Sequence, residues 1–461
     1  MKKMENKIYK KDTSLLLLIV LSFGFVMAVL DTTGVVLAVP EIKKFLIISL
    51  DDSIWIINSY ILALGTFLLF AGSLSSKYGA KKILVIGMTL FVLSSFGCSI
   101  SGNIKILIFC RFLQGVGASL FMPSSMSLLF MAYPDAEKRS KMLGIWTSII
   151  SVATGTGSFI GGTIIQYFGW KTIFLINIPM GIITILFIAI NVKEDIKNRG
   201  IEIDLLSNFL LVMCIASIII FLVEGNQYGF AESKIIIFLI AFICFGMIFV
   251  IREKKISNPI IPKILLTKPK FTITNILGLI INISLYGIIL VLGLYFQIQL
   301  HLSPMVSGLL ILPGMVVLVI GNLFYAKYTT KLKPSKLLIG SVCVTLMGSG
   351  AMYLLSLILI PLPNFVIIII FSIMNLGIGV LVPAITTILM EASGREYSSI
   401  AGATLNANKQ IGGLFGTAIT GMVILRYGNN WNGIIQITFL MNIILYFIGF
   451  ILAKKYISEG D

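Results

Sequence analysis

The sequence predicts an all-α integral membrane protein with fourteen transmembrane helices, arranged as two six-helix bundles with two further helices between them. Three observations predict this fold class: the composition, the lengths of the apolar runs, and the placement of the basic residues. Of the 461 residues, 57% are hydrophobic and only 12% are charged, and the mean hydropathy is +1.03. Soluble domains carry about 25% charged residues. A chain this apolar therefore needs lipid as its solvent.

A helix needs about 20 mostly apolar residues to cross the hydrocarbon core of a bilayer. Runs of this kind recur fourteen times, and the segments between them are too short to fold as soluble domains. The first run follows a basic N-terminus but precedes no small-residue cleavage site, so we expect a retained span rather than a signal peptide. The predicted spans are residues 14–39, 54–76, 83–101, 105–131, 141–165, 170–191, 205–224, 234–251, 271–297, 304–326, 336–358, 364–390, 399–425 and 433–453.

The basic residues predict the orientation of the chain in the membrane. The net charge is +16, but nearly all Lys and Arg residues lie between the apolar runs, which indicates topology signals rather than a nucleic-acid partner. With the N-terminus inside, the inner connections hold 27 of these residues and the outer ones hold 6. We therefore expect a multi-pass protein with both termini in the cytoplasm. The Lys- and Ile-rich composition favours a bacterial cell membrane.

The same residues exclude several function classes. The five cysteines lie inside apolar runs without metal-ligand spacing, and a single histidine, His301, excludes a two-histidine metal site. Widely spaced acids argue against a membrane-embedded enzyme. No G-x-x-x-x-G-K-[ST] loop is present, so an ATP-driven pump would need a separate ATPase subunit. We expect no metal and no cofactor.

Small-residue patterns recur in the two halves of the sequence, which predicts an internal repeat. The repeat divides the chain into an N-terminal six-helix bundle (1–198), two inserted spans (199–256) and a C-terminal six-helix bundle (257–461). Transporters built from paired halves bind substrate near the bilayer midplane and rock to expose it on alternate sides. The matching patterns are Gly72-Ser73-Leu74 with Gly321-Asn322-Leu323, Gly115, Gly117 and Pro123 with Gly377, Gly379 and Pro383, and Gly157 and Gly161 with Gly412 and Gly416.

Several separate stretches resemble the motifs of one transporter family. The resemblance covers essentially the whole chain, so it is more specific than any single pattern. The stretches are Leu30-Asp31-Thr32-Thr33 through Pro40, Gly72 through Lys82, Arg111 through Ala118, Ala153 through Gly162, Trp170 through Gly181, Tyr295 through Pro313, and Asn406 through Gly413.

Together these stretches resemble the major facilitator superfamily, in its fourteen-spanner drug:proton antiporter branch of the multidrug and antiseptic resistance type. The resemblance implies proton-coupled efflux of lipophilic, cationic compounds by a monomer, powered by the proton-motive force. A dedicated exporter of one compound, such as tetracycline or a self-made antibiotic or lipid, is the alternative. Three positions depart from the family pattern: Val36 replaces an asparagine, Ser76 an aspartate and Ser158 a proline.

Asp31 and Arg111 are ionisable residues inside spans 1 and 4, and such residues are functional candidates by default. At 1.5 Å per residue they lie about 12 Å and about 9 Å from the outer edge, so we expect them at similar depth. One interpretation is a static ion pair that fixes helix register. The other is a proton-coupling site, in which alternating access changes the balance between desolvation and the nearby arginine. The corresponding positions of the other half offer no charge, because they lie near Ile373 in span 12 and near residue 281 in span 9, where Asn282 stands instead of a carboxylate.

Glycines and one loop are candidates for conformational change. Gly157, Gly161 and Gly162 of span 5 indicate close helix packing, either as simple contact or at a wall that moves. The segment 72–82 is either a tight basic turn or a gate latch, with Gly72, Lys77 and Gly79 as its candidate residues.

Polar residues inside spans are the candidates for a substrate cavity. For each of them, a helix–helix hydrogen bond is an equally good interpretation. The candidates are Tyr60, Gln114, Gln297, Asn375, Asn406 and Asn408.

Overall fold

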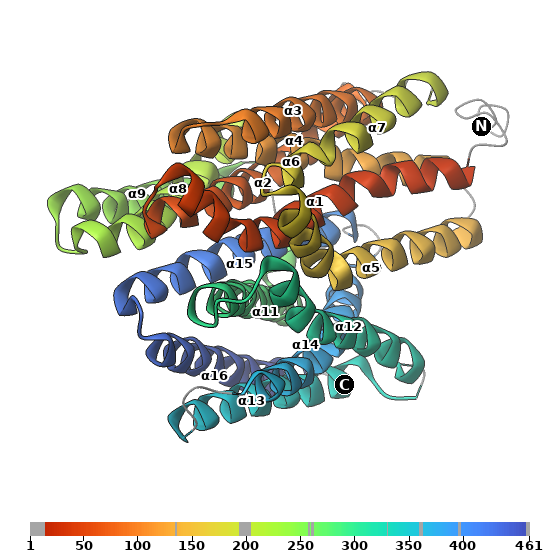
Figure 1. The fold of residues 1–461 in the computed structure, drawn as a ribbon. Helices are drawn as coiled ribbons and strands as arrows, with labels where there is room; N and C mark the ends of the chain where they lie inside the picture. Colours follow the sequence, from red (N-terminus) through yellow and green to blue (C-terminus); the bar gives the residue numbers. More distant parts are fainter. Residues whose placement is uncertain are drawn as a thin grey trace, which may run out of the picture. The chain divides into compact units, whose positions relative to one another are not determined.

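A computed structural model describes residues 14–133, 136–192, 204–256, 259, 262–329, 331–358, 363–394 and 398–457. Almost all of these residues are helical, as the apolar runs predict. The chain divides into two compact units, Met1–Val212 and Met213–Asp461, and the division falls within helix α8 (Leu205–Tyr228). In Figure 1 the first unit runs from red to yellow-green and the second from green to blue.

The first unit consists of long helices connected by short turns. Its sixth predicted span is divided into a one-turn helix and a longer one. The helices before α8 are α1 (Ser14–Leu46), α2 (Leu50–Tyr78), α3 (Ala80–Ile100), α4 (Ile104–Ala132), α5 (Ala136–Phe168), α6 (Thr172–Leu175) and α7 (Asn177–Asn191).

The second unit also consists mainly of long helices connected by short segments. One of them, α11, continues into a π-helical segment, η1. Its core includes buried side chains from α11, α13, α14 and α16, among them Ile281, Leu338, Ile378 and Tyr446. The elements after α8 are α9 (Ser233–Lys255), α10 (Lys263–Leu266), α11 (Pro269–Leu294), η1 (Tyr295–Gln299), α12 (Pro304–Tyr328), α13 (Pro334–Ile358), α14 (Asn364–Ser393), α15 (Ser398–Tyr427) and α16 (Trp431–Tyr456).

Helices at corresponding places in the two units have the same neighbours. Helix α1 packs against α5 and α7, just as α11 packs against α15 and α16. Helix α4 packs against α2 and α3, just as α14 packs against α12 and α13, and α3 contacts α7 as α13 contacts α16. The repeat inferred from glycine patterns in the sequence thus has a counterpart in the helix contacts of each unit.

Local sequence determines where several helices begin and end. The backbone of Gly79 has φ +97°, a left-handed conformation that glycine adopts without strain, and its N–H donates to the Ser75 carbonyl, which ends α2. Asn103 caps α4, because its side-chain oxygen accepts the Lys105 N–H at 2.8 Å. Pro269 and Pro304 occupy the first turns of α11 and α12, where a missing N–H costs nothing.

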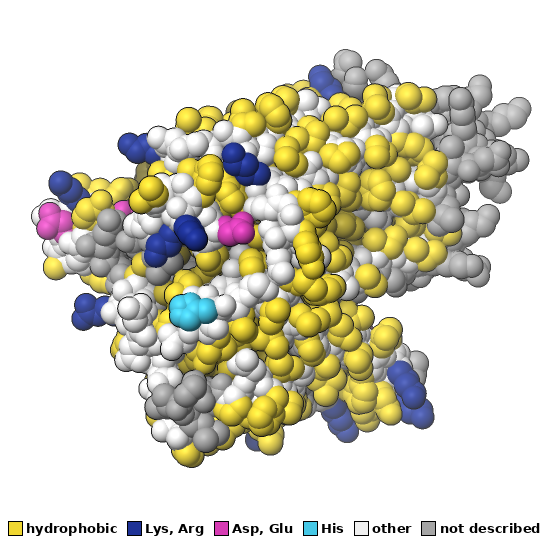
Figure 2. Space-filling model, viewed as in Figure 1, with side chains coloured by type: hydrophobic (Ala, Val, Ile, Leu, Met, Phe, Trp, Pro, Cys, Tyr) yellow, Lys and Arg dark blue, Asp and Glu magenta, His cyan; other side chains and the backbone are white. Residues whose placement is uncertain are grey.

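Among the described residues, eleven helices are long and apolar enough to cross a membrane. The other three predicted spans lie on α2, α5 and α15, and within the described residues of α2 the apolar helix covers Asp52–Leu68. Large apolar side chains such as Leu93, Phe109 and Ile190 are more than half exposed. In Figure 2 hydrophobic side chains cover broad areas of the surface in view, as expected for helices that face lipid.

Candidate functional site

Asp31 of α1 and Arg111 of α4 form a buried ion pair in the first unit. Each residue is only 1% exposed, and Arg111 Nη1 donates to Asp31 Oδ2. The similar depths that the sequence predicts for Asp31 and Arg111 therefore agree with their direct contact in the structure. Two opposite charges withdrawn from water in this way need further hydrogen bonds to offset their desolvation.

Gln114 supplies those hydrogen bonds and closes a ring around the ion pair. Its Oε1 accepts from Arg111 Nη1 at 2.7 Å, and its Nε2 donates to Asp31 Oδ1 at 3.1 Å. The same Nε2 also contacts Ser95 Oγ of α3 at 2.8 Å. Gln114 lies one helical turn after Arg111, so both side chains leave the same face of α4. The sequence marked Gln114 as a cavity candidate, whereas the structure places it between the two charges.

Arg111 is held by three other groups besides Asp31 and Gln114. Its Nε donates to the Ile56 carbonyl of α2 at 3.0 Å. The ring of Tyr60 lies 4.2 Å from the guanidinium carbon, and the ring of Phe174 lies 5.7 Å from it. These cation–π contacts stabilise a cation that is removed from water. Tyr60, another cavity candidate, is thus part of the wall around the ion pair.

Two further polar residues of the site escaped the sequence-based prediction. Cys98 of α3 donates its thiol to Gln114 Oε1 at 3.9 Å. The second is Ser95 of α3, whose Oγ accepts from Gln114 Nε2. Neither residue carries a charge, and a lone Cys or Ser in an apolar run gives no signal in the sequence. The site therefore combines side chains from α1, α2, α3, α4 and α6.

Helices α1 and α5 approach closely beside this site. A Cβ atom added at Gly161 would lie 2.7 Å from the Cα of Gly34, and one added at Gly157 would lie 2.7 Å from Thr33 Oγ1. Gly162 is buried in the same helix. Thr33 and Gly34 follow Asp31 by two and three residues, so the α1–α5 contact borders the ion pair.

This contact gives a testable prediction for Gly161→Ala. The new methyl group would meet backbone atoms, which cannot rotate away, so we expect overpacking to lower the free energy of unfolding by about 1 to 3 kcal/mol. The measurement is the unfolding midpoint of the purified protein in detergent.

Gly72→Ala is the matched control, because a Cβ atom at Gly72 would have no neighbour within 4 Å. We expect that substitution to change the free energy of unfolding by no more than about 0.5 kcal/mol. Equal losses for the two variants would contradict a close α1–α5 contact.

The basic segment 72–82 covers the end of α2, the connecting residue Gly79 and the start of α3. Lys77 Nζ lies 5.8 Å from the ring centroid of its neighbour Tyr78, while Lys81 Nζ donates to the carbonyls of Ala189 and Val192 at the end of α7. The hydrogen bonds that join this segment to the end of α7 therefore come from Lys81, which the sequence-based prediction did not single out. The side chain of Ser76 lies outside the described residues.

The four remaining cavity candidates belong to the second unit. Asn375 of α14 is fully buried and donates to the Phe371 carbonyl at 2.8 Å, whereas Asn406 of α15 is exposed and donates to the Gly402 carbonyl at 3.1 Å. Gln297 lies in η1, half-buried. Asn408 donates to Asn275 Oδ1 of α11 at 2.6 Å and thereby joins two helices. All four residues belong to the second unit, whereas the ion pair belongs to the first.

Glycine contacts indicate which residues of α14 in the second unit correspond to which residues of α4 in the first. A Cβ atom at Gly117 would lie 2.7 Å from the Phe91 nitrogen and 2.8 Å from the Gly87 carbonyl oxygen, both in α3. One at Gly377 would lie 2.8 Å from the Ser341 carbonyl oxygen in α13. Gly377 therefore corresponds to Gly117, and Phe371 to Arg111.

This alignment corrects the prediction for Ile373, whose side chain is 44% exposed and faces away from the bundle interior, whereas Phe371 is 3% exposed. In the second unit, Met374 takes the place of Gln114, and Ser349 Oγ lies 4.0 Å from its sulfur. At the positions of this arginine and glutamine, the second unit therefore has two apolar side chains.

Comparison with known proteins decides the family. The model of the Major Facilitator Superfamily matches residues 21–417. The chain belongs to this superfamily. The superfamily comprises transporters, so Asp31 and Arg111 lie in the interior of a transporter's helices.

Two curated members of the superfamily are similar over most of their length. A methylenomycin A resistance protein of Bacillus subtilis is 35% identical, covering 98% of this chain and 96% of the relative. The multidrug resistance protein Stp of Mycobacterium tuberculosis is 27% identical, covering 90% and 76%. A crystal structure of a peptide transporter in complex with sulfate has a TM-score of 0.71 at 14% identity, covering 99% and 98%, which shows the shared fold.

Proposed function

We propose that this superfamily member is a proton-coupled antiporter that exports small lipophilic drugs from the cytoplasm. The relatives named for methylenomycin A resistance and multidrug resistance support drug efflux as the activity. The observation that carries the proton coupling is the Asp31–Arg111–Gln114 ring, which holds an ionisable carboxyl group inside a membrane helix bundle.

In this proposal Asp31 alternates between two states. When the carboxylate is ionised, Arg111 and Gln114 hold it. A proton arriving from outside neutralises the carboxyl group and weakens its attraction for Arg111, which then keeps Gln114, the Ile56 carbonyl and the Tyr60 ring as partners. Because α1 packs on α5 next to Asp31, a change at the carboxyl group reaches the α1–α5 contact directly. Release of the proton inside completes the cycle.

The membrane arrangement is part of the proposal. Fourteen spans form an N-terminal bundle over 1–198, two inserted helices over 199–256 and a C-terminal bundle over 257–461. The charge distribution supports cytoplasmic termini in a bacterial cell membrane. The transporter acts as a monomer without a cofactor, and the fourteen-spanner drug:proton antiporter branch is its place within the superfamily. Gly72, Lys77 and Gly79 remain candidates for gating, and Gln297, Asn375, Asn406 and Asn408 for the cavity.

The energy source of transport can be tested in inverted membrane vesicles whose membranes contain the transporter. We expect drug uptake driven by a proton gradient to stop when an uncoupler dissipates the gradient while ATP is maintained. Vesicles from the same host without the transporter give the background. Drug uptake that continues in the presence of ATP after the proton gradient has been dissipated would overturn proton coupling and favour a separate ATPase subunit.

A narrow substrate range is the second candidate, and one observation favours it. The relative at 35% identity is named for a single antibiotic, whereas the relative named for multidrug resistance is 27% identical. Growth of a pump-deficient host on methylenomycin A, ethidium and a quaternary ammonium compound separates the two. Protection against methylenomycin A alone indicates the dedicated exporter, and protection against several compounds indicates the multidrug exporter.

A further inference from the structure

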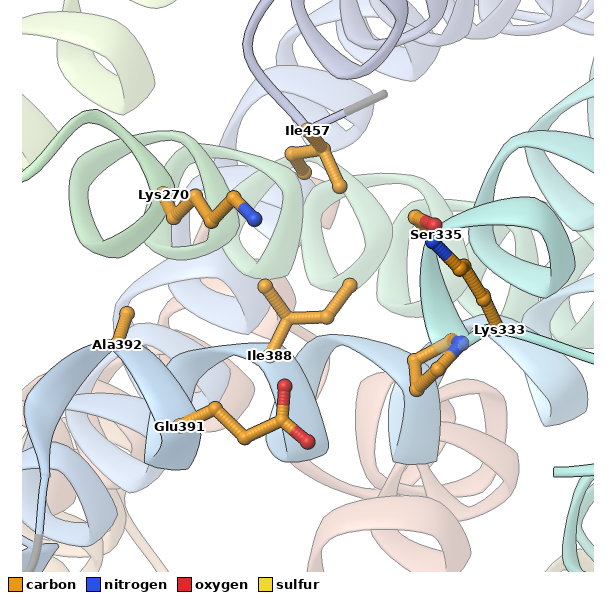
Figure 3. Close-up of a pocket in the computed structure, with 8 residues that line it drawn as sticks. Lys270, Lys333, Ser335, Ile388, Glu391, Ala392 and Ile457 are labelled. Atoms are coloured by element: carbon orange, nitrogen blue, oxygen red, sulfur yellow. The ribbon is translucent and has the colours of Figure 1, made fainter. Parts of the chain in front are cut away.

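A cavity of about 410 Å³ lies where four helices of the second unit begin or end. Lys270 lies at the start of α11, Lys333 and Ser335 at the start of α13, and Glu391 in the last turn of α14. Ile388 of α14 and Ile457, directly after α16, provide apolar walls and are 5% and 1% exposed. Figure 3 shows Lys270 and Glu391 reaching from two different helices toward the same space.

Most of the charged residues that the structure describes around this cavity are cationic. Two lysines and one glutamate line it, and Lys268 lies next to it, with its Nζ donating to the carbonyl of the lining residue Ala392 at 2.8 Å. In the sequence, Lys331 and Lys336 flank the lining residues Lys333 and Ser335. The N-terminal end of α13 also carries the positive end of the helix dipole. This arrangement favours an anionic ligand.

The single carboxylate and the apolar walls restrict what that ligand can be. A bare anion would be repelled by Glu391 and would leave Ile388 and Ile457 without a partner. A phosphodiester that carries hydroxyl groups on one side and a glyceride on the other would match all three kinds of group. Its phosphate would bind the lysines, its hydroxyls would donate to Glu391, and its glyceride would contact the isoleucines.

We propose that this cavity binds the headgroup of an anionic glycerophospholipid with free hydroxyls, of the phosphatidylglycerol kind. The inference rests on the membrane orientation proposed above, in which this end of the unit faces the cytoplasm. Lipid headgroups lie at the level where spanning helices end, and all four helices at the cavity end there. Basic pockets between helices at the cytoplasmic face are suited to anionic headgroups. The bound lipid would hold the inner ends of α11, α13 and α14 together.

The test compares lipid binding by purified full-length protein and two double variants. Native mass spectrometry counts phosphatidylglycerol bound from detergent, with phosphatidylcholine as the uncharged-headgroup reference. We expect Lys270→Gln/Lys333→Gln to lower phosphatidylglycerol occupancy roughly tenfold or more, since each lysine contributes to attraction of an anionic lipid. Lys454→Gln/Lys455→Gln removes the same charge at the end of α16, outside the cavity, and should leave occupancy unchanged.

Two additional experiments address separate questions. The first asks whether the cavity binds a lipid headgroup or a soluble phosphate, and the second tests the role of Glu391. Inorganic phosphate and glycerol phosphate, added to the lipid-free protein at millimolar concentration, should not reproduce the rise in unfolding midpoint that phosphatidylglycerol produces. Glu391→Met, which removes the carboxylate acceptor, should bind phosphatidylglycerol and phosphatidic acid equally well, whereas the wild type should prefer phosphatidylglycerol. Equal phosphatidylglycerol occupancy in both double variants would overturn the proposal, as would equal stabilisation by the soluble phosphates. The drug-transport assay is not part of this test, so its result stands apart from the proposed efflux function.

Discussion

Vesicles carrying Asp31→Asn should lose proton-driven drug uptake down to the background of vesicles that lack the transporter. The asparagine amide cannot bind and release a proton in the physiological range, so the coupling step has no carrier. Its oxygen can still accept the hydrogen bond from Arg111, but its NH2 group cannot accept the one that Gln114 Nε2 donates to Asp31 Oδ1, so the ring loses one hydrogen bond. Arg111 keeps the Gln114 oxygen, the Ile56 carbonyl and the Tyr60 ring as partners. We therefore expect the variant to fold and to reach the membrane, at reduced stability. Uptake and vesicle pH are measured together with fluorescent probes.

Two controls distinguish a lost proton site from a damaged helix bundle. Counterflow, the exchange of drug for drug without a proton gradient, should persist in Asp31→Asn, because alternating access itself remains intact. Asp31→Glu keeps an ionisable group but adds a methylene to a site with 1% exposure, so it should restore only part of the uptake. Normal proton-driven uptake by Asp31→Asn would show that a group other than Asp31 carries the proton.

Arg111→Met is expected to be the most destabilising single substitution at the site. It leaves the Asp31 carboxylate buried with the Gln114 amide as its remaining hydrogen-bond donor in the ring. Removing one partner of a buried ion pair typically costs about 3 to 5 kcal/mol, because an uncompensated charge is left away from water. The measurement is the unfolding midpoint in detergent, together with the amount of monodisperse protein recovered from membranes.

The double variant Asp31→Asn/Arg111→Met tests whether charge is the cause. With both charges removed, no ion stays buried, so most of the stability lost in Arg111→Met should return. Transport should not return, since the proton carrier is still absent. If single and double variants are equally unstable, the contribution of Arg111 comes from its packing against Tyr60 and Phe174 rather than from its charge.

The sequence predicted the helical membrane class and the Asp31–Arg111 pair because both depend on properties that composition reveals. Charge inside an apolar run is conspicuous, and its depth follows from the rise per residue. The rotation of each helix is harder to predict. Ile373 and Phe371 are both apolar, so nothing in the sequence marks which one faces inward, and only the contacts of Gly377 decide.

The sequence offered Gln114 only as a cavity candidate, and it did not single out Ser95 or Cys98. Each of these residues could form a local hydrogen bond in a membrane helix, and many other residues of this chain do so. Their place around the ion pair depends on how α1, α3 and α4 pack together. Lys81 is similar, since its basic charge is explained by topology alone until the end of α7 is seen beside it.

The replacement of Arg111 and Gln114 by Phe371 and Met374 in the second unit has an evolutionary consequence. If energy coupling depends on one repeat alone, the other repeat is released from that constraint. Gene duplication would then have produced one copy that conserves the proton machinery and another that tolerates sequence drift. New drug specificities could arise in the second copy while the means of powering export is inherited unchanged.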